Sequence, residues 1–106
     1  MEIKITKRRL LKEVDNEKCH NWYWLIYGQI INDEGTRFRK FKFVEWFDVF
    51  DVQEYSEYGT SDKADVMEYL DQCIFCRVDL IRGYNDCEEF YKMCNQTIEK
   101  WNRSLS

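Results

Sequence analysis

The sequence contains no proline and only four glycines among its 106 residues. Flexible linkers and low-complexity tails are usually rich in one or both of these residues. A chain of this length also lies within the size range of one domain and can bury a modest core. The scarcity of both residues therefore argues against two modules and predicts a single domain over residues 1–106.

Long apolar runs are missing as well. The N-terminal stretch "MEIKITKRRLLKEV" lacks the continuous apolar core of a signal peptide, and no run approaches the roughly 18 apolar residues of a membrane span. Five cysteines are an odd number in a chain without an export signal, which disfavours a disulfide framework. We expect a cytoplasmic protein with reduced thiols and no membrane partner.

Residues typical of catalysis and metal binding are also scarce. His20 is the only histidine, and it directly follows Cys19, so the two side chains are expected to point in different directions. We therefore expect no enzymatic activity and no cofactor. Cys73 and Cys76 form a C-x-x-C pair without a second pair at matched spacing, so packing in the core is the simpler interpretation, with no bound metal. A small zinc-binding domain, completed by His20 or another cysteine, is the alternative.

Aromatic residues are abundant, with seven Phe, seven Tyr and four Trp. Alternation predicts a strand over residues 2–14, and the aromatic and β-branched stretch 22–31 predicts a central strand. "NDEG" at 32–35 predicts a hairpin loop, with "TRFRKFKF" as the returning strand. Gly28 indicates a bulge or a close backbone approach, and broken alternation predicts a second bulge near Arg39 and Lys40.

The periodicity changes after Gly59. Val66, Leu70 and Cys73 share one helical face, which predicts a helix of about three turns with Thr60 or Ser61 as N-cap. Residues 74–81 alternate again and favour a fourth strand, with continuation of the helix as the alternative.

A second helix is predicted to start in "GYNDCEEF", where Asn85 and Asp86 each have a glutamate three residues later. It runs to about residue 102 with an apolar stripe of Phe90, Cys94, Ile98 and Trp101. The predicted class is α+β, with an antiparallel sheet of three to four strands, formed by an N-terminal meander, packed by two helices.

The net charge of −4 conceals a strong polarity along the chain. Residues 1–44 carry ten Lys and Arg against six Asp and Glu, whereas residues 45–72 carry nine acids against Lys63 alone. Such asymmetry concerns partners and association rates more than the fold.

Acids recur at every third residue in two runs, from Glu45 to Glu57 and from Asp62 to Asp71, with mostly apolar or aromatic residues between the acids of the first run. On a helix this spacing forms a negative ridge, because each step drifts slowly around the surface. One interpretation is a solvated face that keeps the protein soluble. The other is a surface that docks on a basic groove with its aromatic residues as anchors. The candidate partner-binding residues are Glu45, Trp46, Asp48, Phe50, Asp51, Glu54, Tyr55, Glu57, Tyr58, Asp62, Asp65, Glu68 and Asp71, and Phe47 is a further candidate anchor.

The stretch "EWFDVFDVQEYSEYG" followed by "SDKADVMEYLD", in a short acidic chain, resembles the small phage-encoded inhibitors of bacterial defence, including anti-CRISPR proteins and other DNA mimics. This resemblance implies a stoichiometric inhibitor in the bacterial cytoplasm whose carboxylates occupy the phosphate-binding sites of a nuclease. The expected partner is thus a protein such as a nucleic-acid-binding nuclease or effector. Exposed aromatic residues could also form a homodimer.

Direct nucleic-acid binding is the alternative function. Basic residues of "KITKRR" and "RFRKFK" alternate with Phe38, Phe41 and Phe43 on the expected sheet. Aromatic rings interleaved with Lys and Arg are how single-stranded nucleic acid is stacked and held.

Overall fold

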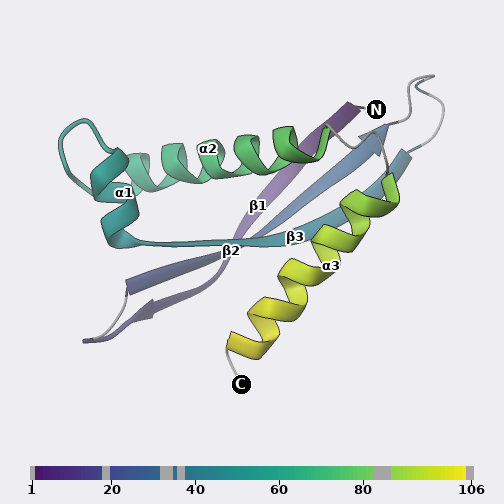
Figure 1. Ribbon diagram of the computed structural model, residues 1–106. Helices are drawn as coiled ribbons and strands as arrows, with labels where there is room; N and C mark the ends of the chain where they lie inside the picture. Colours follow the sequence, from purple (N-terminus) through teal and green to yellow (C-terminus); the bar gives the residue numbers. More distant parts are fainter. Residues whose placement is uncertain (1, 18–19, 32–34, 36–37, 83–86, 105–106) are drawn as a thin grey trace.

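Three antiparallel strands lead into three helices in the computed structural model (Figure 1), which describes residues 2–17, 20–31, 35, 38–82 and 87–104. The strands form a meander in the order β1-β2-β3. The elements are β1 (Glu2–Asp15), β2 (His20–Ile31), β3 (Phe38–Asp48), α1 (Val49–Tyr55), α2 (Lys63–Arg82) and α3 (Cys87–Ser104). The predicted α+β class and N-terminal meander are confirmed.

The central strand β2 is buried on both sides. Trp22, Trp24 and Ile26 belong to the main core cluster, while Tyr23 and Leu25 belong to a second cluster with Val44. Successive side chains of a strand point to opposite faces. Burial of both faces explains why β2 forms an almost continuous apolar run in the sequence. We call the face with Trp22 and Trp24 the helical side, because α1 and α2 cover it, and the face with Tyr23 and Leu25 the open side.

Strand β1 pairs with β2 along its whole length but contains two irregularities. The register shifts between Ile5 and Lys7 and again between Leu10 and Lys12, so Thr6 and Leu11 are extra residues. Each extra residue reverses the alternation of the residues that follow it. The alternation visible at Ile3 and Ile5 is therefore lost further along the strand.

The β2–β3 hairpin pairs without interruption from Asn21 opposite Asp48 to Ile31 opposite Phe38. The bulge predicted near Arg39 and Lys40 is therefore wrong. Phe41 is buried while its neighbours Lys40 and Lys42 are exposed on the other face, as regular alternation requires.

The turn of this hairpin is described only in part. Gly35 has a φ of +70°, the left-handed conformation that the turn prediction gave it. The other loop residues, 32–34 and 36–37, lie outside the described residues.

Gly28 lies where the backbone is approached closely, as predicted. A Cβ atom at this position would lie 2.3 Å from Cζ of Phe41 and 2.7 Å from the carbonyl oxygen of Lys4. Gly28 is paired directly with Phe41 on β3. The absence of a side chain here lets the Phe41 ring cross the middle strand.

Helix α1 follows β3 directly and was not predicted. Its N-cap is Asp48, whose Oδ1 accepts from the backbone N–H of Asp51 at 2.9 Å, while Asp51 Oδ2 accepts from the N–H of Asp48 at 3.4 Å. This reciprocal capping box ends the strand and starts the helix within one residue.

Helix α2 continues to Arg82, so the predicted fourth strand at 74–81 is wrong. Val66, Leu70, Ile74 and Val78 are all buried at four-residue spacing. Ile74 and Val78 fit both a strand and a helix, and no turn residue ends the helix before them. The predicted N-caps Thr60 and Ser61 are also wrong, because Asp62 Oδ1 accepts from the N–H of Asp65 at 3.0 Å.

The apolar stripe of α3 is confirmed, with Phe90 and Cys94 buried and Ile98 and Trp101 half-buried. The predicted caps Asn85 and Asp86 lie outside the described residues. None of the helices in the described part of the chain has the length and apolar character needed to cross a bilayer.

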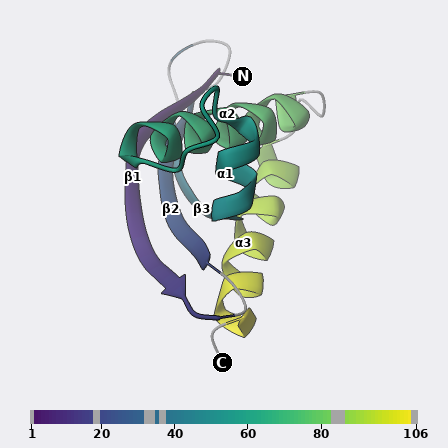
Figure 2. The same cartoon turned by 90° about the vertical axis from the view of Figure 1, so that its left-hand side faces the viewer.

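Helix α3 lies along β3, the outer strand of the sheet, while α2 crosses the helical side (Figures 1 and 2). Two side chains of α3 bond to the outer backbone of β3. Thr97 Oγ1 accepts from the N–H of Val44 at 3.0 Å, and the Tyr91 hydroxyl donates to the carbonyl of Lys40 at 3.0 Å. The helix thus satisfies polar groups that an outer strand would otherwise leave without partners.

Candidate partner-binding surface

Most of the predicted acids have a structural role in the fold. Glu45 is buried on the helical side, where its carboxylate accepts from Nε of Arg77 at 2.5 Å. The Arg77 guanidinium also lies 5.9 Å from the centre of the Phe43 ring. Glu45 joins α2 to the sheet and has no exposed carboxylate to offer a partner.

Three further acids cap helices, one accepts a side-chain hydrogen bond and one forms an ion pair. Asp48 and Asp51 form the capping box of α1, and Asp62 caps α2. The Thr60 hydroxyl donates to the Asp65 carboxylate, which lowers the pKa of Asp65 below its ordinary value of 3.8. Asp71 pairs with Nε of Arg8 on β1 at 2.6 Å. The regular spacing of these acids therefore reflects several separate local roles and does not form one continuous ridge.

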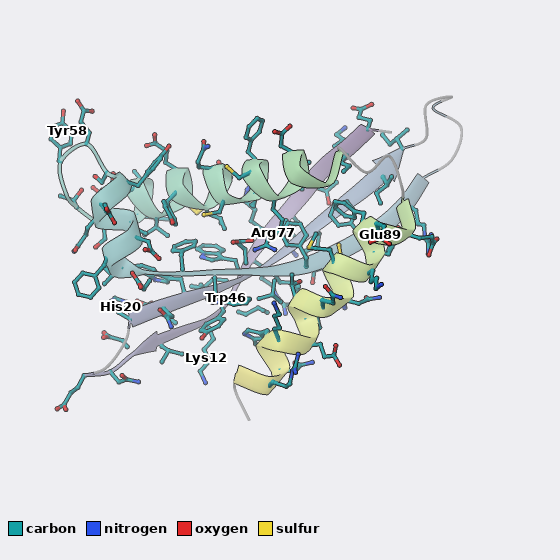
Figure 3. All side chains as sticks on the ribbon, viewed as in Figure 1. Lys12, His20, Trp46, Tyr58, Arg77 and Glu89 are labelled. Carbon is teal, nitrogen blue, oxygen red and sulfur yellow. The ribbon has the colours of Figure 1, made fainter. Side chains whose placement is uncertain are left out.

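Trp46 lies on the opposite side of the sheet from Glu45 and from the helices α1 and α2. Its ring stacks on Tyr23 at a centroid distance of 6.3 Å, on the open side. Figure 3 shows Trp46 and Arg77 on opposite sides of β3. The neighbouring Phe47 is buried against Tyr69 on the helical side, so it cannot serve as an exposed anchor.

The remaining candidates gather on α1 and the turn that follows it. We call this group the α1 surface, and it consists of Phe50, Asp51, Glu54, Tyr55, Glu57 and Tyr58. The exposed fractions of its aromatic residues are 72% for Phe50, 45% for Tyr55 and 81% for Tyr58. Tyr58 is directed away from the body of the protein in Figure 3.

The acids of the α1 surface form no ion pair with any cation in the part of the chain that the structure describes. Residues 45–62 contain six acids and no Lys or Arg. Glu54, Glu57 and, on α2, Glu68 form no ion pair or hydrogen bond with any other residue that the structure describes. Their carboxylates are exposed and directed at solvent.

The backbone beneath the α1 surface is held by local hydrogen bonds. The N–H of Ser56 donates to the carbonyl of Val52 at 2.8 Å, and the N–H of Gly59 donates to the carbonyl of Ser56 at 3.2 Å. The Tyr55 ring meets Tyr69 of α2 edge-on at a centroid distance of 5.4 Å. The exposed rings are thus presented on an ordered support, which reduces the entropy lost on binding.

Two large exposed apolar residues lie outside the predicted candidates, namely Leu10 on β1, which is 45% exposed, and Phe75 on α2. Phe75 is 62% exposed. It was overlooked because residues 74–81 were assigned to a strand. On a helix, its position beside the buried Ile74 places it outside the apolar stripe.

The cysteines differ widely in exposure. Cys94 is buried, Cys73 is half-buried and Cys76 is exposed, so the prediction that Cys76 packs in the core is wrong. Burial raises the pKa of Cys94 to about 12 and that of Cys73 to about 11. Within the described ranges, which exclude Cys19, no three His, Cys, Asp or Glu side chains are grouped as metal ligands would be.

His20 also has partners within the fold. Its Nε2 lies 2.7 Å from Oε1 of Glu13, and its ring lies 4.5 Å from that of Trp22. These contacts hold the start of β2 against β1.

Comparison of the chain with protein-family models, curated proteins and solved structures found no significant match.

Proposed function

We propose that this chain is a non-enzymatic binding protein that inhibits a nucleic-acid-processing protein, such as a nuclease, by docking the α1 surface on its basic groove. The observation that carries this proposal is the exposure of Phe50, Tyr55 and Tyr58 beside carboxylates that have no cationic partner in the described chain.

The aromatic residues would supply most of the binding energy. A few aromatic side chains that fill pockets on a partner typically dominate an interface, and Tyr is among the most enriched. Three such rings contribute no hydrophobic stabilisation while they are exposed to water. A partner that covers them would gain that stabilisation on binding.

The carboxylates would determine the specificity for the partner. A helix about 10 Å long, by the rise of 1.5 Å per residue, presents them as a compact negative group. A groove that binds phosphates offers complementary Lys and Arg side chains, and such complementarity raises the association rate and disfavours acidic partners. The partner is therefore a basic surface, in agreement with the resemblance to phage-encoded inhibitors of bacterial defence.

The test is inhibition of purified nucleases, including RNA-guided effectors, by the purified chain added in equimolar amounts. We expect at least one enzyme to lose DNA binding and cleavage, and we expect the inhibition to weaken as salt rises.

The decisive variant is Glu54→Lys combined with Glu57→Lys, because neither carboxylate has a structural role among the described residues. The matched control is Glu89→Lys combined with Glu99→Lys, which makes the same charge change at exposed positions of α3. We expect the first pair to abolish inhibition and the control to retain it. Equal inhibition by the two double variants, or no enzyme inhibited at all, would contradict the proposal.

A second pair of variants tests the aromatic anchors. Tyr58→Ala should weaken binding by about 30-fold, corresponding to a hot-spot loss of about 2 kcal/mol. Phe75→Ala, which removes another exposed ring, this one on α2, should have little effect. The reverse order would place the interface on α2.

A further inference from the structure

The two bulges of β1 place its basic residues on one side of the sheet. The residues that pair with odd-numbered positions of β2 lie on the open side, because Tyr23 and Leu25 do. Lys4, Lys7, Arg9 and Lys12 pair with Gln29, Tyr27, Leu25 and Tyr23 in that order. Without the extra residues Thr6 and Leu11, regular alternation could not bring positions 4, 7, 9 and 12 to the same face.

Strand β3 adds two more cations to this side. Lys40 pairs with Gln29 and Lys42 pairs with Tyr27, so they flank the middle strand opposite Lys4 and Lys7. With strands about 4.8 Å apart, each of these two rows across the sheet has two cations separated by roughly 10 Å. All of these basic side chains are exposed: Lys4, Lys7, Arg9, Lys12, Lys40 and Lys42. We call this group the basic sheet face.

Few acids neutralise the basic sheet face. By the same register, Glu2 and Asp48 are the acids of β1 to β3 on the open side, and they lie at its two ends. None of the six cations forms an ion pair with another described residue. Lys7 instead lies over the Tyr27 ring, 5.8 Å from its centre.

A cavity of about 400 Å³ lies beside these cations, between β3 and α3. The lining residues are, from the sheet, Tyr27, Lys40, Phe41 and Lys42 and, from α3, Tyr91, Cys94, Asn95 and Ile98. A space of this size accepts a flat heterocycle and lies within the range of small-ligand sites. Asn95 is exposed and carries an amide that can both donate to and accept from a base edge.

We propose that the basic sheet face is a binding site for single-stranded nucleic acid, with one base entering the cavity between β3 and α3. The cations of β1 extend from Lys4, opposite Gln29, to Lys12, opposite Tyr23, which is six residues of β2 or roughly 20 Å at about 3.3 Å per residue, and this suits a strand of several nucleotides. Duplex is excluded from this mode because its stacked and paired bases cannot enter the cavity.

This site differs from the one expected from the sequence. Phe38, Phe41 and Phe43 were the expected stacking residues. Phe41 and Phe43 are buried in the main core cluster, and the side chain of Phe38 lies outside the described part of the structure. The available rings are Tyr27 and Trp46, on the same side as Lys12, and Figure 3 shows Trp46 and Lys12 together on the side of the sheet away from Arg77.

The site is independent of the α1 surface, because the basic sheet face is on the open side of the sheet whereas α1 packs on the helical side. The full chain could therefore hold a nucleic-acid strand while the α1 surface is occupied by a protein. Variants of either surface leave the residues of the other in place, so failure of one proposal does not decide the other.

The experiment is fluorescence anisotropy with labelled single strands of thymidine or uridine of about 12 nucleotides, titrated with the full chain at several salt concentrations. We expect binding at low salt, with a log–log salt slope of about −3, as expected for about four phosphate contacts on a single strand. No binding at low salt would overturn the proposal.

Two variants locate the site. Lys42→Glu should weaken binding about tenfold, and Lys12→Glu, at the other end of the face, serves as a second test should the first variant fold poorly. The matched control is Lys63→Glu, an exposed lysine at the start of α2, which should bind like the unmodified chain. A loss in Lys63→Glu equal to those in the other two variants would overturn the assignment to this face.

Two further probes test entry of a base. A strand of the same length made of abasic units keeps every phosphate and should bind about tenfold more weakly than the thymidine strand. A duplex of that length should also bind more weakly. Equal affinity for the abasic strand, or for the duplex, would overturn the proposal that a base enters the cavity.

Discussion

The helical side and the open side of the sheet carry opposite charge, and they acquire it in different ways. On the helical side the acids come from one continuous segment, and most of them cap a helix or pair with an arginine. On the open side the cations come from two strands at the two edges of the sheet, and the fold gives them no such roles in the described chain. Charged residues that are close together in the sequence can thus have separate structural roles, whereas charged residues that are far apart in the sequence can form one surface.

The largest effect expected concerns the ion pair inside the helical side. Arg77→Ala leaves the buried Glu45 carboxylate without its partner and should cost about 3 kcal/mol of unfolding free energy. The control is Arg8→Ala, which removes the exposed partner of Asp71 and should cost less than about 1 kcal/mol. Urea denaturation at neutral pH measures both. Similar losses in the two variants would show that Glu45 is not a structural acid.

A smaller loss of unfolding free energy is expected when a side chain is added at Gly28, in the middle strand of the sheet. Gly28→Ala places a methyl group against the Phe41 ring and the Lys4 carbonyl and should cost about 2 kcal/mol. Gly59→Ala has open space around the new methyl group and strains only the backbone, at a φ of +66°, so about 1 kcal/mol is expected. Thermal unfolding followed by circular dichroism compares them. An unchanged Tm for Gly28→Ala would mean that the sheet relaxes freely here.

The contact between α3 and β3 should contribute less. Thr97→Val keeps the shape of the side chain but removes the acceptor for the buried N–H of Val44, at an expected cost of about 1 kcal/mol. Tyr91→Phe removes a donor to the more exposed Lys40 carbonyl, where water can replace it, so its effect should be smaller. Amide hydrogen exchange at Val44 provides a local measurement, since exchange should accelerate in Thr97→Val and stay slow in Tyr91→Phe.

The smallest effect is expected at Asp65, whose role at the start of α2 depends on pH. Its pKa in the folded state is lowered, so the carboxylate stabilises the fold above its ordinary pKa of 3.8, and this contribution is lost as the pH falls through the folded value. Asp65→Asn should therefore lower the Tm slightly at neutral pH and match the original chain in strong acid. A difference in Tm that persists unchanged in acid would point to a cause other than charge.

Periodicity in the sequence was sufficient to predict the three strands and the stripe of α3, but it placed the start of the first long helix one or two residues too early. Residues that satisfy two periods at once were not assigned correctly. Ile74 and Val78 fit a strand and a helix equally well. In the structure they lie on a helix, where both are buried in the same core cluster as Leu70. The boundary between β3 and α1 was not predicted either. Asp48 is the last residue of β3 and the N-cap of α1, and no glycine or proline marks this position in the sequence.

The surfaces were less accessible to prediction than the elements. Exposure of Phe50 and burial of Phe47 depend on where β3 ends, and the position of Trp46 depends on which side of β3 it faces. The basic sheet face depends on the register of β1 against β2, which two bulges change. Register is set by partners distant in sequence, so local patterns do not contain it.

The bulges at Thr6 and Leu11 also bear on how the protein behaves when it is concentrated. β1 is an outer strand of 14 residues, and an edge of this length can serve as a template on which another copy adds its own strand and starts an aggregate. The extra residues interrupt the regular row of backbone groups, and the cations along β1 would face those of an approaching copy. The other edge is covered by α3, so both borders of the sheet are protected against growth into a larger one.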